Sequence, residues 1–212
     1  RCFRENAYRF NFMKTSFSNP IRLAGVALLL APALVHAHTG MPGHTHGLES
    51  GLAHPLTGLD HICAMFAVGL WAAQRGGRAI WLVPLTFVAV MGLGGGLATT
   101  GFQLPFVTQG AAASVLVLGI LIATALRLPL AASAALVGLF AVFHGFAHGA
   151  ETAKGTVSGV TYAIGLMLTT ASLHLSGIGI GLLAHQQADT RAFRYAGGVI
   201  GACGLFFCLI NS

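Results

Sequence analysis

Long apolar stretches dominate the pattern of hydrophobic and polar positions along the chain. From residue 55 onwards, six such stretches alternate with short loops that carry most of the charged residues. Each is close to the roughly 20 apolar residues that a helix needs to cross a bilayer, and none has the one-sided pattern of a soluble helix bundle. We therefore predict an all-α, polytopic membrane helix bundle with about six transmembrane helices. The expected spans are Pro55–Gln74, Ala79–Gly101, Phe106–Leu126, Leu128–Gly149, Gly155–Ala184 and Ala192–Ile210.

The segment before these spans has the pattern of a cleavable secretory signal peptide. Lys14 and Arg22 precede the apolar run Leu23–Val35, and a small-x-small cleavage pattern ends at Ala37. The run is too short to cross the hydrocarbon core as a helix. We predict a signal peptide over residues 13–37, an upstream, non-structural extension over residues 1–12, and a mature N-terminus at His38. An uncleaved anchor is the alternative.

The composition fits a lipid environment. Only 8% of the residues are charged, against about 25% in a typical soluble domain. The net charge of +6 does not indicate a nucleic-acid partner, because the positive residues lie before the spans and in loops instead of forming one basic patch. We therefore expect the lipid bilayer as a partner and no nucleic acid.

The charges in the loops predict how the chain is oriented. A signal peptide leaves the mature N-terminus outside, so the first, third and fifth loops are expected to be cytoplasmic. Lys154 is the only positively charged residue of the outer loops, which agrees with the positive-inside rule. We predict a multi-pass protein of the bacterial inner membrane with both mature termini extracytoplasmic. The positive residues of the cytoplasmic loops are Arg75, Arg78, Arg127, Arg191 and Arg194.

A first group of ionisable residues lies at the start of the first span. Pro55 suits the first turn of a helix, so His54 is expected at its entrance. His54 and His61 are seven residues apart and should share one helix face, with Met65 one turn further on. Asp60 should point sideways, toward a neighbouring helix or the same cavity.

A second group lies at the end of the fourth span. His144 and His148 have the i, i+4 spacing of two imidazoles that chelate one metal ion, and Glu151 follows on the same face. The first span runs inward and the fourth runs outward, so both groups should lie at one depth near the outer surface and form one metal site. A proton relay through Asp60 and Glu151 without metal, and a purely structural role, are the alternatives.

Other residues, Met65 among them, are secondary candidates for metal binding. His174, in the middle of the fifth span, is either a deeper station on a path or a hydrogen-bonding residue between helices. Cys63 is either a soft ligand or a packing residue. The extracytoplasmic segment 38–53 is either a metal-capture site or a polar linker. Its ionisable residues are His38, His44, His46 and Glu49.

Glycine pairs spaced four residues apart recur in the apolar stretches, for example at Gly145 and Gly149 and at Gly177 and Gly181. This spacing lets helix backbones approach closely in lipid, so it predicts a compact bundle.

Two motifs give the chain a family resemblance. HPLTGLDH at residues 54–61 and FHGFAHGAE at residues 143–151 resemble the HupE/UreJ family of membrane proteins, and the resemblance extends over the mature chain. It implies nickel uptake that supports hydrogenase or urease maturation, with Co²⁺ or another divalent metal as alternative cargo. The first motif reads H-x5-D-H, one residue longer than the H-x4-D-H signature of the larger nickel/cobalt permeases.

Together these features predict a secondary transporter or permease for a divalent transition metal and not an enzyme, and the resemblance implies Ni²⁺ as its cargo. No permanently bound cofactor is expected, no GxxxxGK[ST] segment is present, and homo-oligomer formation is left open. An intramembrane metal hydrolase, which would lack the HExxH motif, and a non-transporting metal-binding membrane partner are the alternatives. The expected metal ligands are His54, Asp60, His61, His144, His148 and Glu151.

Overall fold

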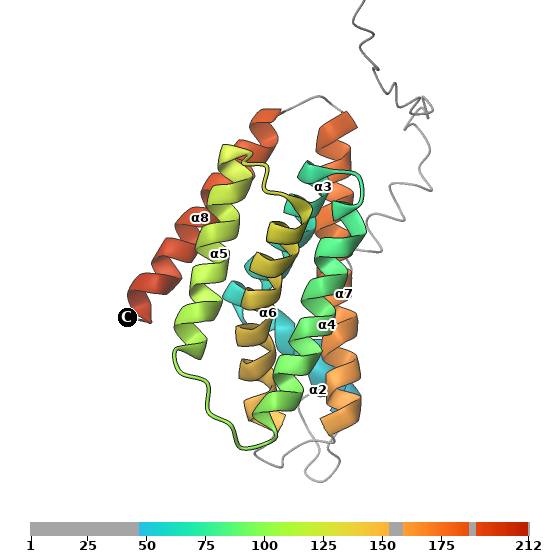
Figure 1. Ribbon diagram of the computed structural model, residues 1–212, viewed down its shortest axis with the longest axis vertical. Coiled ribbons are helices and arrows are strands. Elements are labelled where there is room, and N and C mark those ends of the chain that lie inside the picture. The colour runs from blue at the N-terminus through green and yellow to red at the C-terminus, as the bar shows by residue number, and fades with distance from the viewer. Residues whose placement is uncertain (1–46, 153–158, 187–189, 212) are drawn as a thin grey trace, which may run out of the picture.

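The computed structural model describes residues 47–152, 159–186 and 190–211. The predicted signal peptide and the histidines before residue 47 lie outside these ranges. The described part of the chain is helical and contains no strand (Figure 1). Its elements are α2 (Gly47–Ala53), the 3₁₀ turn η2 (His54–Leu56), α3 (Leu59–Arg75), α4 (Ala79–Ala98), α5 (Val107–Thr124), α6 (Leu130–Thr152), α7 (Gly159–Gln186) and α8 (Thr190–Ile210).

The helices fit a protein that crosses the membrane several times. Within the described residues, the 5 helices α4 to α8 are long and apolar enough to span a bilayer. The segment from α2 through η2 is apolar enough only in combination with α3, with an 81° bend between them, and the described helices make six spans if this bent pair crosses as one. The predicted all-α, multi-pass membrane bundle is therefore confirmed.

The first span is not the continuous helix that the sequence predicted. η2 ends at Leu56, and Gly58 is extended, with φ −107° and ψ 118°, before α3 begins at Leu59. The backbone N–H and the hydroxyl of Thr57 both donate to the carbonyl of His54, at 3.0 and 2.7 Å, and close a turn. Such a side-chain bond competes with the helical pattern. The prediction that His54 and His61 share one helix face is therefore wrong.

The helix before this break was not expected either. α2 lies inside the segment 38–53, which the sequence placed before the membrane domain. Gly51 of α2 packs so closely against α7 that a Cβ built on it would overlap the carbonyl oxygen of Tyr162. This close contact holds α2 against α7 and extends the helical domain back to Gly47.

Glycine brings α4 and α6 into the same kind of contact. A Cβ on Gly145 would overlap the carbonyl oxygen of Met91, and a Cβ on Gly149 would overlap that of Gly95. Close approach of these two helices therefore requires residues without side chains, which confirms the predicted role of the glycine spacing at this pair. The same holds at Gly177, against Phe66 of α3.

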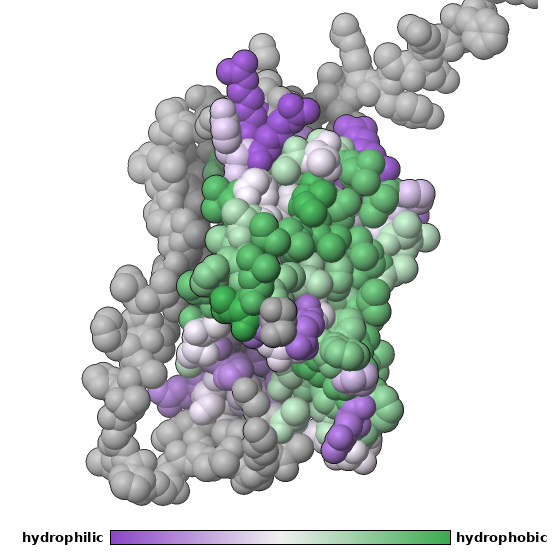
Figure 2. All heavy atoms as spheres, turned by 90° about the vertical axis from the view of Figure 1, so that its left-hand side faces the viewer, coloured by the Kyte–Doolittle hydropathy of each residue, from purple (hydrophilic) through white to green (hydrophobic). Residues whose placement is uncertain are grey.

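The two ends of the bundle differ. In Figure 1, α3 ends, α4 begins, α5 ends and α8 begins at the upper end, so the arginine-bearing loops share that end. Figure 2 shows hydrophilic side chains at this upper end of one face, a broad hydrophobic surface below them, and further hydrophilic side chains toward the lower end. The end of α6 and the start of α7 lie at the lower end, with α2 nearby. The histidine motifs are therefore at the opposite end from the arginines.

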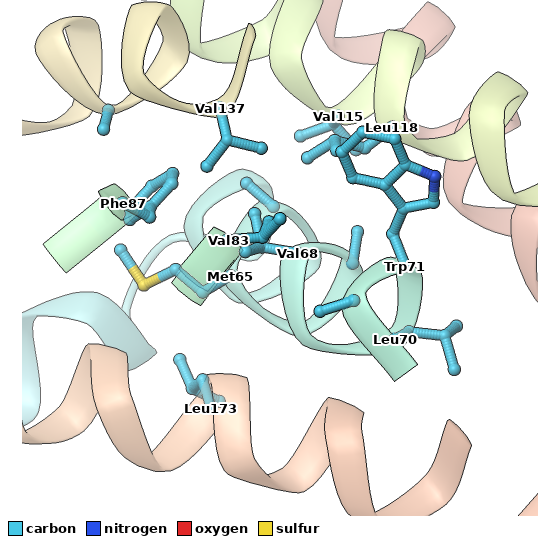
Figure 3. Packing of buried hydrophobic residues seen from close by; sticks show 14 of the residues in the cluster. Met65, Val68, Leu70, Trp71, Val83, Phe87, Val115, Leu118, Val137 and Leu173 are labelled. Carbon is cyan, nitrogen blue, oxygen red and sulfur yellow. The ribbon is translucent and has the colours of Figure 1, made fainter. Parts of the chain in front are cut away.

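An apolar core joins α3, α4, α5, α6 and α7. Figure 3 shows Met65 and Phe87 on one side of this core and Trp71 with Leu118 on the other. Trp71 is fully buried, and the guanidinium carbon of Arg75 lies 5.5 Å from the centroid of its ring. The arginine-rich end of the core is thus filled by large apolar side chains.

Candidate metal site

The two histidine motifs meet at the ring of His148. This ring lies 4.9 Å from that of His54 and 4.7 Å from that of His61, measured between centroids. His61 also contacts His144, at 5.0 Å. His54 reaches His148 from η2 and His61 reaches it from α3, so the break in the first span lets both rings touch the same partner. We call the four rings of His54, His61, His144 and His148 the histidine cluster.

Asp60 fixes the orientation of His61. Its Oδ1 lies 2.9 Å from Nδ1 of the ring. Because an ionised carboxylate can only accept, Nδ1 carries the hydrogen and Nε2 of the neutral ring presents a lone pair. Nε2 is buried and has no hydrogen-bond partner within the described part of the chain. A carboxylate that orients an imidazole in this way is typical of the residues behind metal ligands.

Ser114 of α5 orients His144 by a similar arrangement. The hydroxyl of Ser114 donates to the carbonyl of Ala111 at 2.6 Å, so its oxygen accepts from Nε2 of His144 at 2.9 Å. The lone pair of the neutral His144 ring is then on Nδ1. This nitrogen is buried and finds no hydrogen-bond partner among the described residues. In the sequence, Ser114 is marked only as a polar residue within an apolar span.

The cluster is part of a longer line of rings that runs along the bundle. Tyr162 contacts His54 at 5.9 Å, while Phe87 contacts both His144 at 5.6 Å and His174 at 5.1 Å. Tyr162 and His174 are both on α7, and a helical rise of 1.5 Å per residue separates them by about 18 Å. We call this line the ring file. In order, its members are Tyr162, His54, His148, His61, His144, Phe87 and His174.

The deeper residues predicted as secondary candidates are buried near each other. Nδ1 of His174 donates to the carbonyl of Met65 at 3.0 Å, so the hydrogen-bonding role left open for His174 is present. Met65 and His174 are both almost inaccessible to solvent. Phe87 contacts both His174 and His144 of the histidine cluster, and the sequence did not single it out.

A cavity opens beside the cluster. It has a volume of about 610 Å³, lies between α4, α6 and α7, and reaches His148. Gly96 and Gly149 form part of its wall, and a Cβ on Gly96 would meet no atom within 4 Å. The cavity therefore leaves space for a small ion next to His148.

Several predicted ligands are not among the residues of the histidine cluster. The side chain of Glu151 and the whole of His38, His44 and His46 lie outside the described residues. The thiol of Cys63 is within hydrogen-bonding reach of Cys203 on α8. In the part of the chain that is described, no group of three or more His, Cys, Asp or Glu side chains is arranged so that it could hold a metal ion. Metal binding by the cluster stays a prediction.

Both motifs fall within a region that matches a known protein family. Residues 26–207 match the family described as HupE / UreJ protein. The chain belongs to the HupE/UreJ family. One relative, named Protein HupE, from Rhizobium leguminosarum bv. viciae, is 43% identical over 180 residues, which is 84% of this chain and 92% of the relative. No solved structure matches the chain.

Membership of the HupE/UreJ family confirms the resemblance on which part of the sequence interpretation rests. The match covers every described helix from α2 to α7 and most of α8. The histidine cluster, the ring file and the cavity therefore all lie within the region that this HupE/UreJ protein shares with its family.

Proposed function

We propose that this chain is a secondary transporter that imports a divalent transition metal, with Ni²⁺ as the preferred cargo, across the bacterial inner membrane. The ion would enter at the end of the bundle that carries the histidine cluster and exchange water for imidazole there. It would then move along the ring file toward His174. Asp60 and Glu151 would offset part of the cost of placing a dication inside a membrane.

The orientation of two imidazole lone pairs carries the proposal. His61 and His144 each use one ring nitrogen to donate, to Asp60 and to Ser114, and each keeps the other nitrogen buried without a hydrogen-bond partner in the described region. A buried polar atom without a partner is costly, so such atoms mark sites where a ligand is missing. Neutral, oriented imidazoles are suitable donors for borderline ions such as Ni²⁺, Cu²⁺ and Zn²⁺.

Two further observations support transport. Membership of the HupE/UreJ family is consistent with a role connected with metal transport, and the resemblance of the two motifs points to nickel. The ring file also extends about 18 Å along α7, which is more than a single binding site needs. A line of donors at increasing depth suits an ion that moves.

Metal ions would come from the outside, and the packed core would close the path on the cytoplasmic side. His38, His44 and His46 would collect ions outside the membrane before they reach the histidine cluster. Beyond His174, the buried side chains of Trp71, Leu118 and Ile122 fill the bundle toward the arginine-rich end. Release into the cytoplasm would therefore require helices to move, as in other transporters that expose a site to each side in turn.

Metal accumulation tests the proposed function. Radioactive Ni²⁺ would be measured in cells that lack their own nickel importers, with the full chain or with an empty vector, and with membrane levels checked by immunoblot. We expect accumulation only when the chain is present, and its reduction by excess unlabelled Ni²⁺.

A protein that is present in the membrane but accumulates neither Ni²⁺ nor Co²⁺, Cu²⁺ or Zn²⁺ would contradict import. In that case, equilibrium dialysis of the purified protein would distinguish the rival functions. Tight Ni²⁺ binding without any change in cellular metal would favour a non-transporting metal-binding partner.

A further inference from the structure

Two methionine sulfurs meet at one hydroxyl in the middle of the bundle. Oγ1 of Thr170 on α7 donates to Sδ of Met65 on α3 at 3.4 Å and lies 3.9 Å from Sδ of Met91 on α4. None of these three side chains is more than 1% exposed. Three helices thus bring two thioethers and a hydroxyl to one point, well away from solvent.

His174 adds an imidazole to this group. It lies one turn after Thr170 on α7, and its Nδ1 is 3.0 Å from the carbonyl oxygen of Met65. Because a carbonyl can only accept, Nδ1 carries the hydrogen, and Nε2 of the neutral ring presents a lone pair. That atom is buried and has no hydrogen-bond partner in the part of the chain that the structure describes.

The group lies between the histidine cluster and the closed end of the core. Met65 is four residues after His61 on α3, which places its Cα about 6 Å further along the helix. Phe87 contacts both His144 and His174, so its ring links the cluster to this deeper group. Figure 3 shows Met65 on the same side of the core as Phe87.

We propose that Met65, Met91 and His174 form a second metal site that receives the ion after the histidine cluster, a step that rests on the import function proposed above. Its donors are two thioethers and one imidazole, all neutral and comparatively soft. Such a set favours borderline and soft transition-metal ions over Mg²⁺ and Ca²⁺, which require oxygen ligands. The site would therefore select the cargo after the cluster has captured it.

Nickel X-ray absorption tests this site directly. The protein would be purified with Cys2, Cys63, Cys203 and Cys208 replaced by alanine, so that only methionine supplies sulfur, and loaded with two equivalents of Ni²⁺. We expect sulfur ligands in addition to nitrogen. The double variant M65L/M91L should lose the sulfur signal, whereas the matched variant M167L should keep it. Leucine conserves the volume of methionine, so folding is expected to persist and is checked by size-exclusion chromatography.

Uptake measurements separate this proposal from the function on which it rests. If the unmodified chain imports Ni²⁺, the M65L/M91L variant should lose uptake by about tenfold or more, the scale on which residues supporting a metal site act. If the unmodified chain imports no Ni²⁺ but shows sulfur ligands that depend on Met65 and Met91, import fails and the site stands. A nickel spectrum without sulfur ligands, or one unchanged in M65L/M91L, overturns the site even if import is established.

Discussion

His61 of α3 and His148 of α6 pack ring against ring, with centroids 4.7 Å apart and planes inclined by 60°. Each belongs to a different motif, and His148 also touches His54 across the break in the first span. The contact joins one histidine oriented by Asp60 to a helix whose other histidine is oriented by Ser114. Loss of either ring should therefore disable one shared site.

Removing the charge of Asp60 should weaken metal capture. The carboxylate accepts from Nδ1 of His61 and keeps the lone pair on Nε2. In Asp60→Asn the amide holds the ring less firmly and offers no charge to a dication. We expect the Ni²⁺ concentration for half-maximal uptake to rise by about 10- to 100-fold, with less effect on the maximal rate. Initial uptake rates over a range of Ni²⁺ concentrations measure both.

The variant Asp60→Glu is the matched control, because it retains the negative charge on a longer side chain. Its Ni²⁺ concentration for half-maximal uptake should lie between those of the unmodified chain and Asp60→Asn. Half-maximal concentrations that are equal in all three proteins would show that Asp60 has no part in capturing the ion.

Adding one methyl group where α4 meets α6 should destabilise the bundle. A Cβ at Gly145 or Gly149 would overlap backbone oxygens of α4, so the helices must separate. We expect Gly149→Ala to lower the stability by about 1–3 kcal/mol, as overpacking does in other cores. In detergent, Gly149→Ala should lose its monodisperse fraction at a lower temperature than the unmodified chain.

Gly96→Ala supplies the comparison for this packing effect. Gly96 is on the same pair of helices, but a Cβ there meets no atom within 4 Å. It should be tolerated. Equal thermal stability of the two alanine variants would mean that the close contact between α4 and α6 does not limit stability.

The position of the positive charges predicts which end faces the cytoplasm. Arg78 and Gln103 are exposed in loops at opposite ends of the bundle. Single cysteines at these positions, in a chain whose own cysteines are replaced, would be treated with a membrane-impermeant thiol reagent. In intact spheroplasts we expect labelling at position 103, and labelling at position 78 only after the membrane is opened. The reverse pattern would invert the proposed direction of transport.

Much of the fold follows from the sequence because lipid imposes a simple requirement. A span must be apolar and long enough to satisfy its backbone internally, and α4 to α8 match the predicted stretches to within a few residues at most ends. The placement of both histidine motifs at one end follows in the same way, since the first span and the fourth run in opposite directions. The contact between His61 and His148 agrees with that placement.

The break in the first span could not be predicted from the sequence. Pro55 suggested a helix start, but Thr57 closes a turn on His54 and Gly58 is extended, so the first motif is split between η2 and α3. Hydrophobicity alone does not report a bend, because both sides of the break are apolar. The seven-residue spacing of His54 and His61 therefore predicts a shared helix face that the bend removes.

The partners of the motif residues were also not predictable. Ser114, Phe87 and Tyr162 lie on three other helices and carry no local pattern that links them to the histidines. Their roles arise only when α4, α5 and α7 pack around α3 and α6. A single sequence contains the motif residues but not the register in which neighbouring helices meet them.

The account depends most directly on the histidine cluster acting as one transport site. The decisive measurement is radioactive Ni²⁺ uptake by cells that express His61→Ala or His148→Ala at the membrane level of the unmodified chain. His185→Ala is the control, because His185 lies against Phe193 in the last turn of α7, at the opposite end of the bundle from the histidine cluster. We predict that either cluster variant reduces uptake to the background of the empty vector, while His185→Ala transports normally. Normal uptake by either cluster variant would contradict a shared site and the path built on it.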